Sequence, residues 1–260
     1  MKNIFIINIF VILMISVGVF FLQLQDRLNN AKYTYVKTYE VFALIIDEKV
    51  EEDEVSEEQE YENDYYESIQ EFIPIFSGEP LPDDIIEYIN GLSFKEDTAL
   101  TYGELTYLTI TYVNFDGENM IGNMIVSAEI GEEVLDIFQE IYESGFPINS
   151  IRLIDDFNAD DDLSMAANNS SAFNWRYVAG TRRLSNHAFG MAIDINPVQN
   201  PYVRGGNILP AAGEEYLDRS DIRPGMIIPG DVVYNAFISR GWTWGGNWTT
   251  VKDYHHFERT

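Results

Sequence analysis

The feature that most limits what this chain can fold into is an acidic run from Asp47 to Glu71. Its twenty-five residues, DEKVEEDEVSEEQEYENDYYESIQE, include thirteen Asp or Glu and one Lys. Such a run repels itself and has too few apolar side chains to build a core, so it is typical of an extended spacer. The composition favours a solvated spacer over an acidic binding tail. We therefore expect the folded domain to span residues 72–260.

The N-terminus predicts a membrane anchor. The stretch from Ile4 to Leu22 is uncharged, and its nineteen residues can cross a hydrocarbon core of roughly 30 Å as a helix. The residues that follow, FFLQLQDR, contain no small-residue cleavage site; a cleaved signal peptide with a secreted form, or a buried helix, is the alternative. Lys2 favours a cytoplasmic N-terminus, which places the rest of the chain outside the cell membrane. We expect residues 1–24 to be a single-pass anchor and residues 25–71 a juxtamembrane segment and acidic linker.

Overall composition excludes several classes of function. The chain has 43 acidic and 16 basic residues and a formal net charge of −27, which would repel phosphate backbones, so we expect no nucleic-acid partner. Cysteine is absent, and this excludes disulfides, thiolate metal sites and cysteine nucleophiles.

The segment after the linker predicts an α+β domain with a mainly antiparallel sheet and flanking helices. Alternating apolar and polar residues predict strands within 99–115 and 120–130, joined by a turn at DGEN. Apolar residues at steps of three and four within 132–145 predict an amphipathic helix that ends at Gly145. We also expect strands at 148–157, 173–180, 190–197 and the C-terminus, helices at 159–170 and 231–242, and a turn-rich insertion at 199–231.

All three histidines of the chain lie in two short stretches, SNHAFGMAID at residues 185–194 and DYHHFE at residues 253–258. His187, Asp194 and one histidine of the second stretch would supply two imidazoles and a carboxylate, the ligands of a catalytic zinc site that keeps a fourth position for water. A carboxylate beside such water, here Asp253, can take its proton.

Two other interpretations fit the same residue types. Histidines often do no more than satisfy a polar neighbour. Two histidines and a carboxylate also form the metal site of non-haem iron oxygenases, but that site expects a His-x-Asp pair, which this chain lacks.

The two stretches together resemble a known family. SNHAFGMAID fits Ser-x-His-x-x-Gly-x-Ala-x-Asp, and DYHHFE fits acid-x-x-His. This pairing resembles the zinc D-alanyl-D-alanine carboxypeptidase family, which includes VanX- and VanY-like enzymes and L-alanyl-D-glutamate endopeptidases. GWTWGGNWTTVKDYHHFE and HAFGMAIDINPVQNPYV look most like the endopeptidase-type branch, and the similarity covers roughly residues 150–260.

The resemblance implies a role for each matching position. It makes His187, Asp194 and His256 the ligands of one zinc ion per chain and Asp253 the general base. His255 would occupy a variable position and could point elsewhere, because neighbours on a strand face opposite sides. Arg176 resembles the family arginine that binds the scissile carbonyl or a substrate carboxylate, and Arg182 or Arg183 could share that role.

Four further positions have expected roles. Ser185 would orient the loop or contact substrate, and Gly190 would let the backbone turn closely past the metal. Trp244 and Trp248 are candidate walls of a substrate groove, because tryptophan is rarely fully buried. Packing in the core is the alternative role for both.

The resemblance also implies a fold and an activity. The fold would be the DD-peptidase or Hedgehog-like α+β type, with the cleft where the two motifs meet. The activity would be zinc-dependent hydrolysis of peptidoglycan stem peptides by a membrane-tethered domain outside the cytoplasm. Whether the bond is L-Ala–D-Glu or terminal D-Ala–D-Ala stays open, and an inactive wall-binding module on the same fold is the alternative.

Overall fold

The computed structural model of the protein describes residues 72–260. The predicted anchor at 1–24 and the predicted linker at 25–71 lie outside the described residues, so they stay predictions. Within the described part of the chain, no helix combines the length and the apolar character needed to cross a bilayer.

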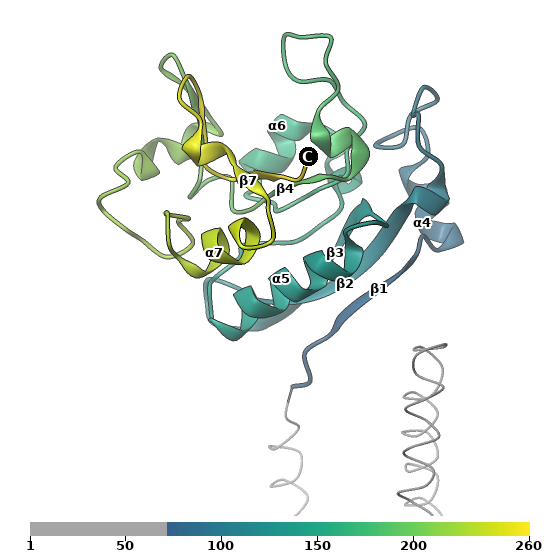
Figure 1. Ribbon diagram of the computed structural model, residues 1–260, viewed down its shortest axis with the longest axis horizontal. Helices are drawn as coiled ribbons and strands as arrows, with labels where there is room; N and C mark the ends of the chain where they lie inside the picture. The colour runs from purple at the N-terminus through teal and green to yellow at the C-terminus, as the bar shows by residue number, and fades with distance from the viewer. Residues whose placement is uncertain (1–71) are drawn as a thin grey trace, which may run out of the picture. The chain divides into compact units, whose positions relative to one another are not determined.

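The first half of the described chain forms a three-stranded antiparallel sheet (Figure 1). Its strands are β1 (Phe76–Pro80), β2 (Leu105–Val113) and β3 (Asn119–Ser127), in the order β1-β2-β3. The hairpin between β2 and β3 was predicted from alternation, and its register pairs Leu105 with Ser127 and Val113 with Asn119. Helix α4 (Asp83–Ile89) follows β1 and was not predicted.

Helix α5 (Gly131–Glu143) links this sheet to the C-terminal half of the domain (Figure 1). It contacts β1 and β2 on one side and α7 (Val232–Ile238) on the other. Its buried residues include Val134, Phe138 and Ile141, three of the residues that predicted an apolar helix face. The helix is therefore the shared centre of one large core.

Two small sheets complete the architecture, both antiparallel and both three-stranded. One has the order β4-β9-β7 and the other β6-β5-β8. Phe257 of β9 stacks on Phe237 of α7, with ring centroids 4.1 Å apart, so the first sheet shares its core with α7. The remaining elements are β4 (Ala192–Asp194), β5 (Tyr202–Arg204), β6 (Asn207–Leu209), β7 (Thr243–Trp244), β8 (Lys252–Asp253), β9 (His256–Glu258), α6 (Asp161–Ala166) and the 3-10 turns η1 (Tyr102–Glu104), η2 (Ile154–Phe157), η3 (Asn186–Phe189), η4 (Ala211–Tyr216) and η5 (Gly245–Asn247).

The α+β class is confirmed, but three small antiparallel sheets replace the expected larger one. Two predicted strands are wrong. Residues 148–157 contribute a bridge and η2, and residues 173–180 contribute only an isolated bridge. The physical reason is visible in the second segment, where consecutive backbone N–H groups of Phe173, Asn174 and Trp175 donate to Ile125, His187 and Ser93 in turn. A chain that bonds to three different neighbours cannot form a ladder with any one of them.

Candidate metal centre

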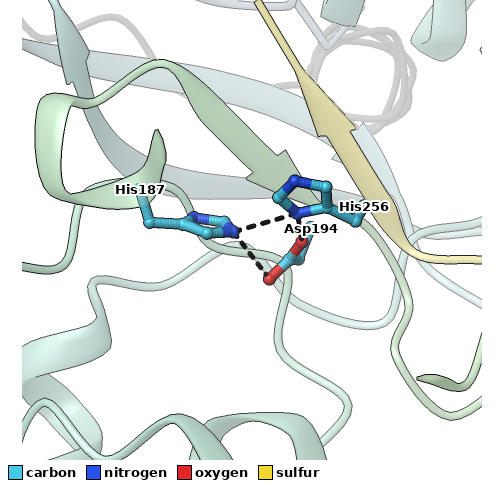
Figure 2. A group of neighbouring side chains, drawn as sticks. All are labelled: His187, Asp194 and His256. Carbon is cyan, nitrogen blue, oxygen red and sulfur yellow. Dashed lines mark hydrogen bonds and ion pairs between the residues drawn. The ribbon is translucent and has the colours of Figure 1, made fainter. Parts of the chain in front are cut away.

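Two short strands bring the two histidine motifs together. β4 pairs antiparallel with β9, and their register places Asp194 directly opposite His256. Opposite residues of an antiparallel pair project their side chains to the same face. The carboxylate of the first motif and the imidazole of the second therefore meet although 62 residues separate them (Figure 2).

His187 reaches the same point from the turn η3. The Ser185 side chain accepts a hydrogen bond from the His187 backbone N–H and caps the turn. Ser185 is 6% exposed, so the structure supports loop orientation rather than substrate contact. Gly190 ends the turn at φ 64°, and a Cβ there would lie 2.4 Å from the backbone N of Ser127. The close approach that the structure shows at Gly190 is to β3.

The ligand atoms of His187, Asp194 and His256 form a compact triangle (Figure 2). His187 Nε2 lies 3.1 Å from Asp194 Oδ2 and 3.2 Å from His256 Nδ1, and His256 Nδ1 lies 2.9 Å from Asp194 Oδ1. Tetrahedral zinc with ligands at 2.0–2.1 Å requires ligand–ligand distances of about 3.3 Å. All three side chains are buried, and the triangle has the size of one face of such a tetrahedron.

The outer nitrogen of each imidazole also has a partner. His187 Nδ1 lies 2.6 Å from the carbonyl oxygen of Ala172, and His256 Nε2 lies 3.2 Å from Glu258 Oε2. Asn186 Nδ2 donates to the same Glu258 oxygen at 2.7 Å. Since the outer nitrogens donate, the inner nitrogens of the neutral rings present lone pairs toward each other and toward the Asp194 carboxylate. Three converging electron-pair donors fit a cation, and the donor set fits zinc.

Charges in the cluster follow from this proximity. Asp194 is fully buried, which by itself would raise its pKa, but His187 and His255 hold that pKa well below its usual range. Burial opposes the charged form of His256, yet hydrogen bonds to Asp194 and Glu258 outweigh it and raise its pKa to about 10. In the metal-free chain a proton on His256 would therefore compete with a cation for this site.

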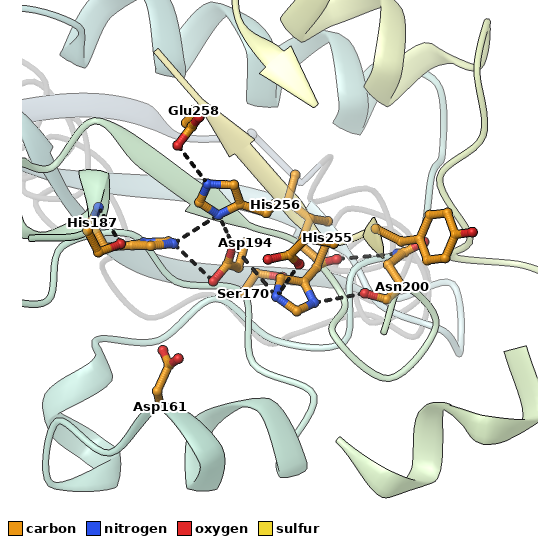
Figure 3. A network of polar contacts seen from close by, with 12 residues as sticks. Asp161, Ser170, His187, Asp194, Asn200, His255, His256 and Glu258 are labelled. Atoms are coloured by element: carbon orange, nitrogen blue, oxygen red, sulfur yellow. Dashed lines mark hydrogen bonds and ion pairs between the residues drawn. The ribbon is translucent and has the colours of Figure 1, made fainter. Parts of the chain in front are cut away.

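Strand alternation suggested that His255 could point elsewhere, but its ring lies beside the cluster. It is 3% exposed, its Nδ1 lies 2.8 Å from the carbonyl oxygen of Asn200, and its Nε2 lies 2.9 Å from Asp253 Oδ1 (Figure 3). The same Nε2 is 3.9 Å from Asp194 Oδ1. The expected general base Asp253 is thus held beside the cluster by the histidine that the sequence left without a role.

The backbone around Asp253 is equally constrained. A Cβ at Gly245 would lie 2.6 Å from the carbonyl oxygen of Asp253, so only glycine allows η5 to approach β8 this closely. The Asp253 side chain is 14% exposed, which leaves it some access to solvent.

Arg176 lies in the irregular segment before η3, and its Nη2 is 2.9 Å from Asp161 Oδ2 on α6. Arg182 and Arg183, the alternatives for its role, are exposed in the following turn. Neither forms a hydrogen bond or an ion pair with the three cluster residues. The pKa of Glu258 is lowered mainly by its hydrogen bond with His256 and to a smaller extent by the charge of Arg183.

The two candidate groove tryptophans lie in different environments. Trp244 is 3% exposed, its Nε1 donates to the carbonyl oxygen of Tyr254, and it belongs to the main core. The structure therefore places Trp244 in the core, the alternative role given for it. Trp248 is half-buried, and its ring centroid lies 5.5 Å from that of His256. Trp248 is thus the one of the pair that borders the cluster.

Sequence reasoning missed three neighbours of the cluster, namely Glu258, Asp161 and Asn200. Glu258 lies two residues beyond a predicted ligand, and alternation along a strand was the pattern that could have found it. No pattern in the sequence predicted that Asp161 and Asn200 lie near the cluster, because their positions depend on contacts between segments far apart in the chain.

A buried His–Asp–His group beside a further carboxylate could hold one metal ion, and hydrolytic zinc sites use the same types of ligand. Residues 179–259 match the family model described as D-alanyl-D-alanine carboxypeptidase. This match confirms the resemblance to the zinc D-alanyl-D-alanine carboxypeptidase family that the two histidine motifs indicated. The matched segment includes all three cluster residues and Asp253, and Arg176 and Asp161 lie before it. No curated protein and no solved structure matches the chain. The match and the cluster together support a zinc-dependent peptidase.

Proposed function

We propose that this protein is a membrane-anchored zinc peptidase that hydrolyses peptidoglycan stem peptides outside the cytoplasm. The observation that carries the proposal is the triangle of His187, Asp194 and His256, whose lone pairs converge within a segment that matches the carboxypeptidase family. The membrane and wall location rests on the apolar stretch at Ile4–Leu22 and the acidic spacer after it.

Zinc bound at this triangle would polarise the scissile carbonyl and lower the pKa of water. Asp253 would accept the proton released by the attacking water and then deliver it to the leaving amine. His255 would orient the Asp253 carboxylate through its 2.9 Å contact, and Asn200 would hold the far side of the His255 ring. Arg176 would donate a hydrogen bond to the oxygen that becomes negative as the carbonyl is attacked.

The test is digestion of purified sacculi by the full-length protein in detergent, with the fragments identified by mass spectrometry. Zinc-loaded protein should generate new termini, and both chelation and Asp253→Asn should abolish them while Asp253→Asn keeps bound zinc. Asp162→Asn removes an equal charge from an exposed site on α6 and should leave digestion unchanged. Intact muropeptides from folded, zinc-loaded protein would contradict the peptidase; if that protein bound sacculi tightly, the wall-binding module would be the better description.

A further inference from the structure

The ion pair between Arg176 and Asp161 has a consequence for substrate choice. α6 already has a cap, because the Asp160 side chain accepts a hydrogen bond from the Leu163 backbone N–H. Asp162 is exposed. Of the three consecutive aspartates, only Asp161 turns its carboxylate to Arg176, and helix capping does not explain why.

The pair lies next to the metal centre. The backbone around Arg176 is hydrogen-bonded to the loop that carries His187: Ser185 N–H donates to the Arg176 carbonyl at 3.0 Å, and Asn174 N–H donates to the His187 carbonyl at 3.1 Å. The Asp161 carboxylate projects from α6 toward His187 and Asp194 (Figure 3). Burial raises the pKa of Asp161 while Arg176 opposes this, and the charges of Asp194 and His187 also act on it.

Pairing changes what the guanidinium can bind. Among the described residues, Asp161 is the only carboxylate in an ion pair with Arg176, and Arg176 Nε is buried without a hydrogen-bond partner. A free carboxylate on the substrate would compete with Asp161 for one cation and would face a like charge a few ångströms away. A neutral carbonyl or amide oxygen could accept a hydrogen bond there without that repulsion.

We propose that Asp161 is a specificity-determining residue, which neutralises Arg176 and thereby favours substrates that present an uncharged carbonyl at this point over substrates that present a free C-terminal carboxylate. The inference rests on the proposed function and deepens it. It assigns the protein to the cleavage of internal peptide bonds rather than to the removal of a C-terminal residue.

The first arm of the test measures hydrolysis. The stem peptide that carries the bond cleaved in the sacculus digest is prepared as a C-terminal acid and as a C-terminal amide. Full-length zinc-loaded wild type should prefer the amide in kcat/KM. Asp161→Asn should move the amide-to-acid ratio toward the acid by about tenfold, the effect of one uncompensated charge at close range. Asp161→Glu should restore the wild-type ratio, and Asp162→Asn should leave it unchanged.

The second arm does not need activity. Binding of N-acetyl-D-alanine and of its amide is measured by calorimetry on full-length, zinc-free protein, so that the acid cannot bind through the metal. Asp161→Asn should tighten binding of the acid by about tenfold, in a salt-dependent way, and leave the amide unaffected. Asp161→Ser replaces Asp161→Asn in both arms if circular dichroism shows the Asn variant to be unfolded.

The outcomes separate the two proposals. If wild type cleaves nothing, the proposed function fails, and the binding arm still decides the role of Asp161. An amide-to-acid ratio and an acid affinity that both stay at wild-type values in a folded Asp161 variant would overturn the inference.

Discussion

Glu258 should raise zinc affinity although it is not one of the three candidate ligands. Its Oε2 lies 3.2 Å from the outer nitrogen of His256 and accepts a second hydrogen bond from Asn186 at 2.7 Å. This pair of contacts holds the His256 ring so that Nδ1 faces Asp194, and it makes that nitrogen a stronger electron-pair donor. Glu258→Ala removes both effects and leaves His256 in place.

The magnitude follows from two opposing effects. Loss of a carboxylate behind a ligating histidine costs about 10- to 100-fold in metal affinity, or roughly 1.4 to 2.7 kcal/mol. Glu258 also raises the pKa of His256, so the variant retains fewer protons that compete with zinc. This second effect offsets part of the loss, and we therefore expect a decrease of about tenfold near pH 8.

The assay is competition for zinc between the full-length protein and a chromophoric chelator. Glu258→Gln keeps an acceptor oxygen without the charge and should lose less than Glu258→Ala. Circular dichroism and the melting temperature of the metal-free protein would show whether each variant is folded. A zinc Kd within about threefold of wild type in a folded Glu258→Ala protein would refute the assigned role of this carboxylate.

Three further predictions concern the same region. In the folded metal-free chain the pKa of His256 is raised to about 10, above its unfolded value, so the stability that its protonation contributes is present in full below about pH 6.5 and is lost toward pH 10. Zinc affinity should rise over the same pH window, and an indicator dye at pH 8 should register at least one proton released per zinc bound. If no proton is released, the raised pKa of His256 is contradicted. Gly190→Ala should destabilise the protein by roughly 2–4 kcal/mol in urea unfolding, because it adds a clash with Ser127 to the strain of a positive φ. Gly180→Ala, at φ 73° with nothing within 4 Å of its Cβ, should lose only about 1 kcal/mol, and equal losses would show that the clash is absent. Trp248→Ala should raise KM with little change in melting temperature, since its half-buried ring borders His256, and a large drop in stability would instead mark it as a core residue.

Local patterns predicted the elements whose own residues specify them. The alternation in β2 and β3, the apolar face of α5 and the acids of the first turn of α6 all depend on neighbours within about ten residues. The segments that failed, 148–157 and 173–180, carry the same residue types. Several of their backbone groups bond to distant partners, and Ile154–Phe157 forms the local turn η2. Periodicity has no information about such partners.

The candidate site divides in the same way. The sequence by itself predicted the candidate ligands His187, Asp194 and His256 and the candidate base Asp253, because they stand in two short motifs that resemble a family. The tertiary structure alone decided that His255 holds Asp253, that Trp244 lies in the core, and that Asp161 pairs with Arg176. A motif records which groups stand at a fixed spacing along the chain. Which other charges surround those groups depends on how strands, turns and helices from distant segments pack. At this site those charges shift the pKa of Asp194 and of His256. In our proposal, Asp161 adds the choice between a neutral and a charged substrate group.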